Sequence, residues 1–195
     1  PLKTILLLII ILANIGCETK RHHATQTRSH ELISQNKIIG SIQTPSDYKK
    51  RSNDMFISGK DIINETLLLN LGGYNTIVRI WKTKQKSKDQ ANQKPDTIES
   101  ILEYKKDQDP DFEKTKKELL KLLTIENEVT DSTLELYKNN GLTWLQLNTT
   151  MKENKKNKYF LHINKSTNDI YWVVFTITND DFSDIDNIMK SILFN

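Results

Sequence analysis

The only cysteine of the chain, Cys17, is the side chain whose position best indicates chemistry. It directly follows Gly16, at the end of a segment with one charge, Lys3, and an unbroken apolar run over residues 5–13. A membrane-spanning helix needs about 20 apolar residues, so this short run favours a signal peptide over a transmembrane anchor. We therefore expect residues 1–16 to be a signal peptide that is cleaved before Cys17, whose thiol is then available for modification.

The tetrapeptide Asn14-Ile15-Gly16-Cys17 resembles the lipobox of bacterial lipoproteins. In that family the small residue before the cysteine lets the signal peptidase act, and the thiol takes a diacylglyceryl group. The resemblance implies lipidation of Cys17, stable membrane anchoring by more than one acyl chain, and a place in the bacterial cell envelope, at the outer membrane or the periplasmic face. Asn14 departs from the usual Leu or Val. The alternative is an ordinary secretory signal with a free thiol.

The charge balance argues against a nucleic-acid partner. The chain has 28 Lys and Arg and 25 Asp and Glu, and cleavage would remove Lys3 and leave a net charge of +2. Nucleic-acid binders carry a concentrated basic face. We expect the partners to be a membrane, through lipid on Cys17, and a protein of unknown identity.

No motif for nucleophilic, zinc or nucleotide chemistry occurs in the sequence, so we assign no catalytic residue, no metal site and no cofactor. His162 is the only histidine of the expected domain, and its apolar strand context favours a structural or surface role. Further metal or acid–base candidates lie in the tether and at expected helix starts, where solvation or capping explains them: His22, His23 and His30, Asp107 and Asp109, and Asp180 and Asp181.

Trp144 and Trp172 are the candidate binding residues. They lie on neighbouring or near-neighbouring expected strands, and the alternation around Trp172 places aromatic side chains on both faces of the sheet. A second aromatic face could bind a ligand or a protein. Coverage of that face by helices is the more common arrangement.

The mature chain divides into a flexible tether at 17–36 and a single domain at 37–195. The tether is polar and has no apolar periodicity. Residues 82–94 are almost entirely polar and predict an exposed loop that could contact an acidic partner or a membrane. Strands are predicted in KIIGSIQTP ending at Pro45, MFISG at 55–59, NTIVRIWK at 75–82, STLELYKN at 132–139, GLTWLQLNTT at 141–150, KYFLHIN at 158–164 and IYWVVFTIT at 170–178.

Short connectors make the last four strands antiparallel, with Asn139-Asn140-Gly141 as a hairpin turn. Helix starts are indicated by a capping box from Asp96 to Glu99 and by Asp109-Pro110. An apolar face follows the second start, and a C-terminal amphipathic helix is predicted from Ile185, Ile188, Met189, Ile192 and Leu193. The predicted fold class is α+β, a twisted antiparallel sheet flanked by helices.

This order of elements, closing on Ser191-Ile-Leu-Phe194, resembles the PsbP-like fold over about residues 37–195. That family includes the PsbP extrinsic subunit of photosystem II and many small bacterial envelope lipoproteins. The resemblance implies a binding or assembly-support protein without a catalytic centre, and it transfers no functional residue. The alternatives are an envelope immunity protein that neutralises a toxin, which genomic context would reveal, and a hydrolase or metal-dependent enzyme, which would need His162 to converge with acidic side chains in a deep pocket.

Overall fold

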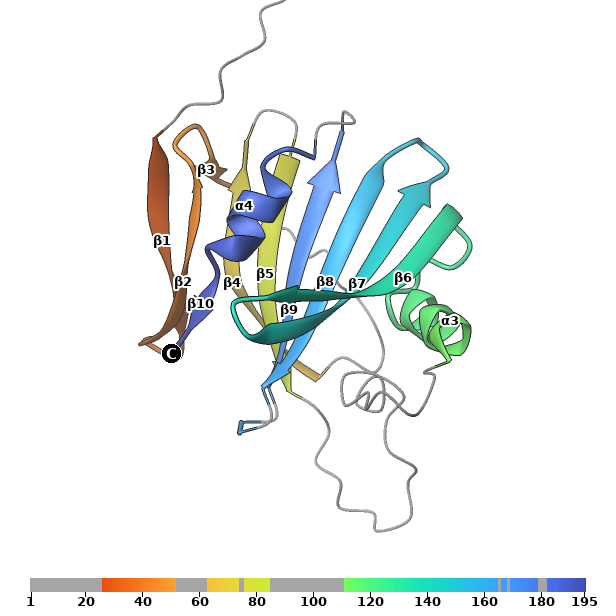
Figure 1. The fold of residues 1–195 in the computed structure, drawn as a ribbon, viewed down its shortest axis with the longest axis horizontal. Coiled ribbons are helices and arrows are strands. Elements are labelled where there is room, and N and C mark those ends of the chain that lie inside the picture. Colours follow the sequence, from red (N-terminus) through yellow and green to blue (C-terminus); the bar gives the residue numbers. More distant parts are fainter. Residues whose placement is uncertain are drawn as a thin grey trace, which may run out of the picture.

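Two antiparallel sheets make up most of the fold in the computed structural model of this chain (Figure 1). The structure describes residues 26–51, 63–73, 76–84, 111–164, 166–167, 169–178 and 182–195. Its strands are β1 (Thr27–Ser34), β2 (Lys37–Pro45), β3 (Lys49–Lys50), β4 (Ile63–Gly72), β5 (Thr76–Lys84), β6 (Val129–Asn139), β7 (Leu142–Met151), β8 (Lys156–Asn164), β9 (Asp169–Ile177) and β10 (Leu193–Phe194). The helices of these ranges are α3 (Phe112–Leu122) and α4 (Ile185–Lys190).

The larger sheet has the order β3-β4-β5-β9-β8-β7-β6, and its four last strands confirm the predicted meander. The turn between β6 and β7 consists of Asn140 and Gly141, with φ of 48° and 76°. These positive values are the ones that a two-residue hairpin loop requires, and Asn and Gly adopt them at little cost. Strand β9 lies in the middle of the sheet because it also pairs with β5 along its whole length.

The smaller sheet corrects the prediction of a tether up to residue 36. Residues 27–34 form β1, which pairs with β2 through a turn at Gln35 and Asn36, and β10 pairs with the other edge of β2. The tether interpretation failed because β1 buries few side chains, among them Leu32, which is fully buried in the core. The folded region therefore includes at least the ten residues before Lys37.

Each face of the larger sheet carries its own apolar core. On one face the smaller sheet and α4 cover a cluster that includes Ile80, Trp144 and Phe175. On the other face α3 covers a cluster that includes Trp81, Trp172 and Leu119. Strand β9 contributes alternate side chains to the two clusters, so its near-continuous apolar sequence follows from burial on both faces.

Both helices predicted for the described part of the chain are present, but their ends differ from the prediction. Helix α3 buries the predicted face, but its N-cap is Asp111, whose side chain accepts from the Lys114 N–H, and not Asp109. Helix α4 ends at Lys190, and Leu193, predicted as helical, belongs to β10 and is 56% exposed. The fold is thus mostly antiparallel sheet with few helices.

Several predictions lie outside the described residues: the signal peptide, Cys17, the strand at 55–59, the helix start at Asp96 and the loop residues beyond Lys84. Within the described part, Lys82, Thr83 and Lys84 belong to β5 and not to the predicted loop. Strand β4 had not been predicted. Its sequence INETLLLNLG lacks the alternation that marks a half-buried strand.

Candidate functional site

Trp144 and Trp172 do not form the predicted binding surface. Both are 1% exposed, and they lie in the cores on opposite faces of the larger sheet. Trp172 Nε1 donates a buried hydrogen bond to Thr83 Oγ1 at 3.0 Å, which satisfies the indole. The aromatic character of both faces therefore reflects two covered faces, and the binding interpretation of these two residues is wrong.

His162 belongs to an aromatic group on the α4 side of the sheet. Its Nδ1 donates to the Thr143 main-chain carbonyl at 3.0 Å, and its ring stacks on Phe194 with 6.2 Å between centroids. Trp144 lies beside the same imidazole, at 5.3 Å between centroids. These contacts give His162 a structural position between strands.

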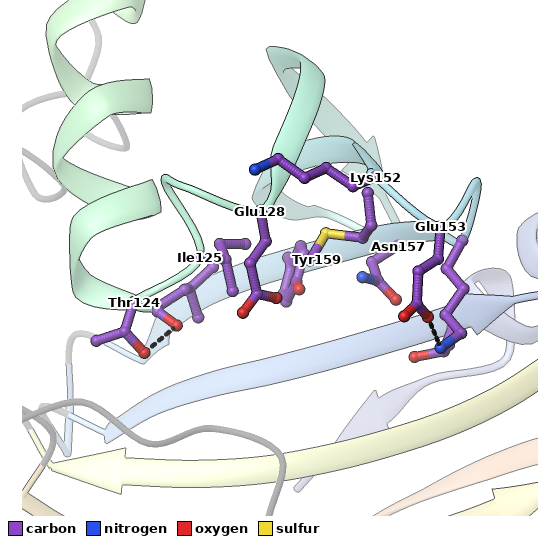
Figure 2. A pocket seen from close by; sticks show the side chains of 11 residues that line it. Thr124, Ile125, Glu128, Lys152, Glu153, Asn157 and Tyr159 are labelled. Atoms are coloured by element: carbon purple, nitrogen blue, oxygen red, sulfur yellow. Dashed lines mark hydrogen bonds and ion pairs between the residues drawn. The ribbon is translucent and has the colours of Figure 1, made fainter.

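The candidate functional site is a pocket of about 530 Å³ on the α3 side of the sheet (Figure 2), which we call the Tyr159 pocket. Its walls come from the end of α3, the segment that leads into β6, the β7–β8 turn, and strands β8 and β9. The lining residues are Leu123, Thr124, Ile125, Glu128, Met151, Lys152, Glu153, Lys155, Asn157, Tyr159 and Thr176. Apolar and charged side chains are thus mixed around one concave site.

Main-chain hydrogen bonds fix the two walls relative to each other. After the end of helix α3, the Ile125 N–H donates a hydrogen bond to the Leu120 carbonyl at 3.1 Å. The Lys152 N–H then donates to the Glu128 carbonyl at 2.9 Å, which joins the segment after α3 to the β7–β8 turn. Asn154, with φ of 57°, allows that turn to close. The pocket mouth is therefore held by backbone geometry.

Tyr159 forms the floor of the pocket and is 1% exposed. Burial raises the pKa of its phenol to about 12, and the nearby polar side chains of Thr149 and Asn157 lower it by less. The hydroxyl group is protonated at physiological pH, as in any ordinary tyrosine, so it can both donate and accept a hydrogen bond. This property suits recognition of a polar group.

Asn157 supplies a second polar atom beside the phenol. Its Oδ1 is buried and has no hydrogen-bond partner within the described ranges, although the residue is 4% exposed. Buried polar atoms are paired in the great majority of cases. Arg79 does not line the pocket, but its Nη1 donates to Oγ1 of the lining residue Thr176 at 3.4 Å, which places a cation close by. The floor therefore offers an acceptor, a neutral phenol and a nearby positive charge.

The rim of the pocket is charged and exposed. Lys155 forms an ion pair with Glu153, and this hydrogen bond lowers the pKa of the Glu153 carboxyl. Figure 2 shows Glu128 and Lys152 next to each other on one wall of the pocket. The rim offers both signs of charge around an apolar and hydrogen-bonding interior, an arrangement found at specific binding sites.

A second cavity, of about 790 Å³, separates β1 from β4, and we call it the β1–β4 groove. His30, predicted to lie in the tether, lines this groove from β1 and shares a hydrogen bond of 3.0 Å with Thr44 Oγ1. Burial and the nearby Arg28 lower the pKa of His30. The groove lining is Arg28, Ser29, His30, Glu31, Ile33, Tyr48, Lys50, Leu67, Leu68, Leu69, Asn70 and Leu71.

The described ranges hold no group of three or more His, Cys, Asp or Glu residues placed to bind a metal ion. Among their helices, none has both the length and the apolar character needed to cross a bilayer.

Tyr159 and Asn157 were not singled out as a site from the sequence. Their spacing of two on β8, with Leu161 next in the series, places all three on the α3 face of the sheet. The sequence therefore held one signal for this site. A polar residue, Asn157, is followed two positions later by a tyrosine in a row of side chains that point toward the core. The end of α3 also lines the pocket, but the local pattern on β8 does not predict where that helix end lies.

No protein-family model matches the sequence, and no curated protein sequence matches it. The structure is similar to the solution structure of cyanobacterial PsbP (CyanoP) from Synechocystis sp. PCC 6803, with a TM-score of 0.52 and 7% identity, over 92% of this chain and 98% of that chain. A crystal structure of a protein from Bacteroides thetaiotaomicron VPI-5482 aligns with a TM-score of 0.40 and 14% identity, over 80% of this chain and 45% of that chain. The first similarity supports a PsbP-like fold.

Proposed function

We propose that this chain is a bacterial envelope lipoprotein, anchored through lipid on Cys17, that acts without catalysis as a binding or assembly accessory protein. The observation that carries the binding role is the Tyr159 pocket, which joins a buried neutral phenol, an acceptor on Asn157 and a charged rim. The PsbP-like fold adds support, since the similar solved structure is named for PsbP.

The pocket has the features of a recognition site. Its interior includes the apolar side chains of Leu123, Ile125 and Met151 beside the polar floor. An extended segment of a protein partner could place an apolar side chain there and donate a main-chain N–H to Asn157 Oδ1. Such a combination of an apolar anchor and a few fixed polar groups gives both affinity and orientation.

The anchor is tested by the intact mass of membrane-extracted protein from the native host, compared with a Cys17→Ala variant. A mass of residues 17–195 plus acyl groups, absent from the variant, is the expected result. An unlipidated or uncleaved chain would contradict anchoring and leave the binding role to be judged alone.

The binding role is tested with a photo-crosslinking amino acid at Lys152, on the pocket rim, in living cells of the native host. The matched control carries the same probe at Lys117, which is exposed on α3. We expect a discrete protein adduct from position 152 that is absent from position 117 and is lost when Tyr159→Phe and Asn157→Ala are combined. Adducts that are the same at both positions, or that persist in the double variant, would refute the pocket as the partner site.

A further inference from the structure

A group of four exposed cations lies at the end of the molecule where the folded chain begins. It consists of Arg28 on β1, Lys49 and Lys50 on β3, and Arg51, and we call it the basic end. Arg28 and Lys50 line the same β1–β4 groove, although 22 positions separate them in the sequence. The fold therefore gathers charges that the sequence shows only as a short Lys-Lys-Arg run.

Backbone pairing fixes this gathering. Thr27 pairs with Pro45, and the Ser46 N–H donates to the Gln26 carbonyl at 3.1 Å. The start of β1 therefore lies beside the end of β2. Immediately before β3, the Tyr48 N–H donates a hydrogen bond to the Pro45 carbonyl at 3.1 Å. Figure 1 shows the start of β1 and the strand β3 at the same end of the molecule.

Strand β3 is itself held against the larger sheet. Lys49 pairs with Gly72, and the Arg51 N–H donates to the Asn70 carbonyl at 2.9 Å. The side chain of Arg51 crosses Gly72 at the position where a Cβ would stand. Among the described residues, the acidic ones nearest in sequence are Glu31 and Asp47, which are also exposed and are outnumbered by the four cations.

The chain length between Cys17 and the basic end limits how far the domain can move from an anchoring membrane. Residues 18–26 are nine residues, which span at most about 30 Å when fully extended. Anionic leaflets attract Lys and Arg within a Debye length, which is about 8 Å at physiological ionic strength.

We propose that the basic end is a membrane-contact surface that orients the domain against the anionic headgroups of the leaflet holding the Cys17 lipid. This inference rests on the proposed anchoring. It also implies that the domain has a preferred orientation, in which the β1–β4 groove opens close to the membrane surface.

The test measures how fast a lysine-acylating reagent labels each lysine of the lipidated full-length protein on vesicles. One preparation uses phosphatidylcholine alone, and the other adds phosphatidylglycerol. We expect labelling of Lys49 and Lys50 to slow several-fold on the anionic vesicles, while Lys37, at the other end of the β1–β2 hairpin, and Lys117 on α3 keep their rates. High salt should remove the difference.

A charge-reversed variant, Arg28→Glu with Arg51→Glu, keeps both lysine reporters and should abolish their protection. The matched control, Lys37→Glu with Lys117→Glu, changes the net charge equally and should preserve it. Equal labelling of Lys49 and Lys50 on the two vesicle types, or an equal slowing of Lys37 and Lys117, would overturn the inference. The mass of the protein before labelling separates the two proposals. If Cys17 carries lipid but Lys49 and Lys50 are not protected from labelling, only the proposed orientation is refuted. If Cys17 carries no lipid, the anchor on which the orientation rests is refuted.

Discussion

The ring of Phe194 stacks on the ring of Tyr171 with 4.2 Å between centroids. Tyr171 belongs to β9 at the middle of the larger sheet, and Phe194 belongs to β10 of the smaller sheet. One aromatic pair thus joins the two sheets at the C-terminal end of the chain, close to His162 and Trp144.

Replacement Phe194→Ala should therefore destabilise the whole domain. Phe194 is partly buried, so the expected loss is about 2 kcal/mol in the free energy of unfolding, below the range for a fully buried phenylalanine. Urea unfolding followed by tryptophan fluorescence measures it. The neighbouring change Leu193→Ala, at a side chain that is 56% exposed, should cost less than about 0.5 kcal/mol. Equal losses in the two variants would show that the stacking does not join the sheets.

The buried hydrogen bond from Trp172 to Thr83 predicts a specific effect of removing its acceptor. In Thr83→Val the indole N–H keeps its burial and loses its partner, so the unfolding free energy should fall by about 1–3 kcal/mol. Thr83→Ser retains the hydroxyl group and should lose less. If the valine variant were as stable as the wild type in thermal unfolding, the bond would contribute nothing.

The meander β6–β9 was predictable from the sequence because its signals are local. Alternating side chains and the Asn140-Gly141 turn specify both the strands and their antiparallel pairing. Strand β1 lacks such signals, because its only apolar residues are Leu32 and Ile33 and its turn, Gln35-Asn36, contains no glycine. Strand β4 contains the run LLL, whose side chains are divided between the two apolar cores.

The candidate site was less predictable than the fold for the same reason. Tyr159 and Asn157 were visible as strand residues, but Ile125 and Lys152 reach the pocket only through the end of α3 and the β7–β8 turn. Trp144 and Trp172 were predicted as binding residues because large aromatic side chains often mark binding surfaces. Burial on both faces of the sheet accounts for them instead.

The turn at Gly141 predicts a backbone effect separate from side-chain packing. A Cβ at this position would meet nothing within 4 Å, so Gly141→Ala should cost only the strain of φ at 76°. That cost is about 1 kcal/mol. Gly141→Asn should be less destabilising because asparagine tolerates positive φ. Equilibrium unfolding in urea distinguishes the two, and an alanine variant at least as stable as the asparagine variant would contradict this account.

The buried phenol of Tyr159 predicts a loss of stability at alkaline pH. Its pKa in the folded protein is about 12, above the value of 10.0 for an exposed tyrosine, so the folded state holds this proton more tightly than the unfolded state. The stability from this difference is fully present below pH 10 and is lost as the pH rises through 12. A difference of this size corresponds to about 2–3 kcal/mol.

Urea unfolding of the wild type and of Tyr159→Phe at a series of pH values measures this effect. At neutral pH the wild type should be the more stable protein by about 1 kcal/mol, because the variant has no hydroxyl group beside the buried polar side chains of Thr149 and Asn157. Between pH 10 and 12 that advantage should shrink and reverse, since only the wild type must hold or ionise a buried phenol at position 159. Tyr137 and Tyr171, whose pKa values burial also raises, are present in both proteins and cancel in the comparison. Stability curves that stay parallel from pH 7 to 12 would mean that the hydroxyl group of Tyr159 ionises as freely as an exposed one, and would contradict the raised pKa of this buried phenol.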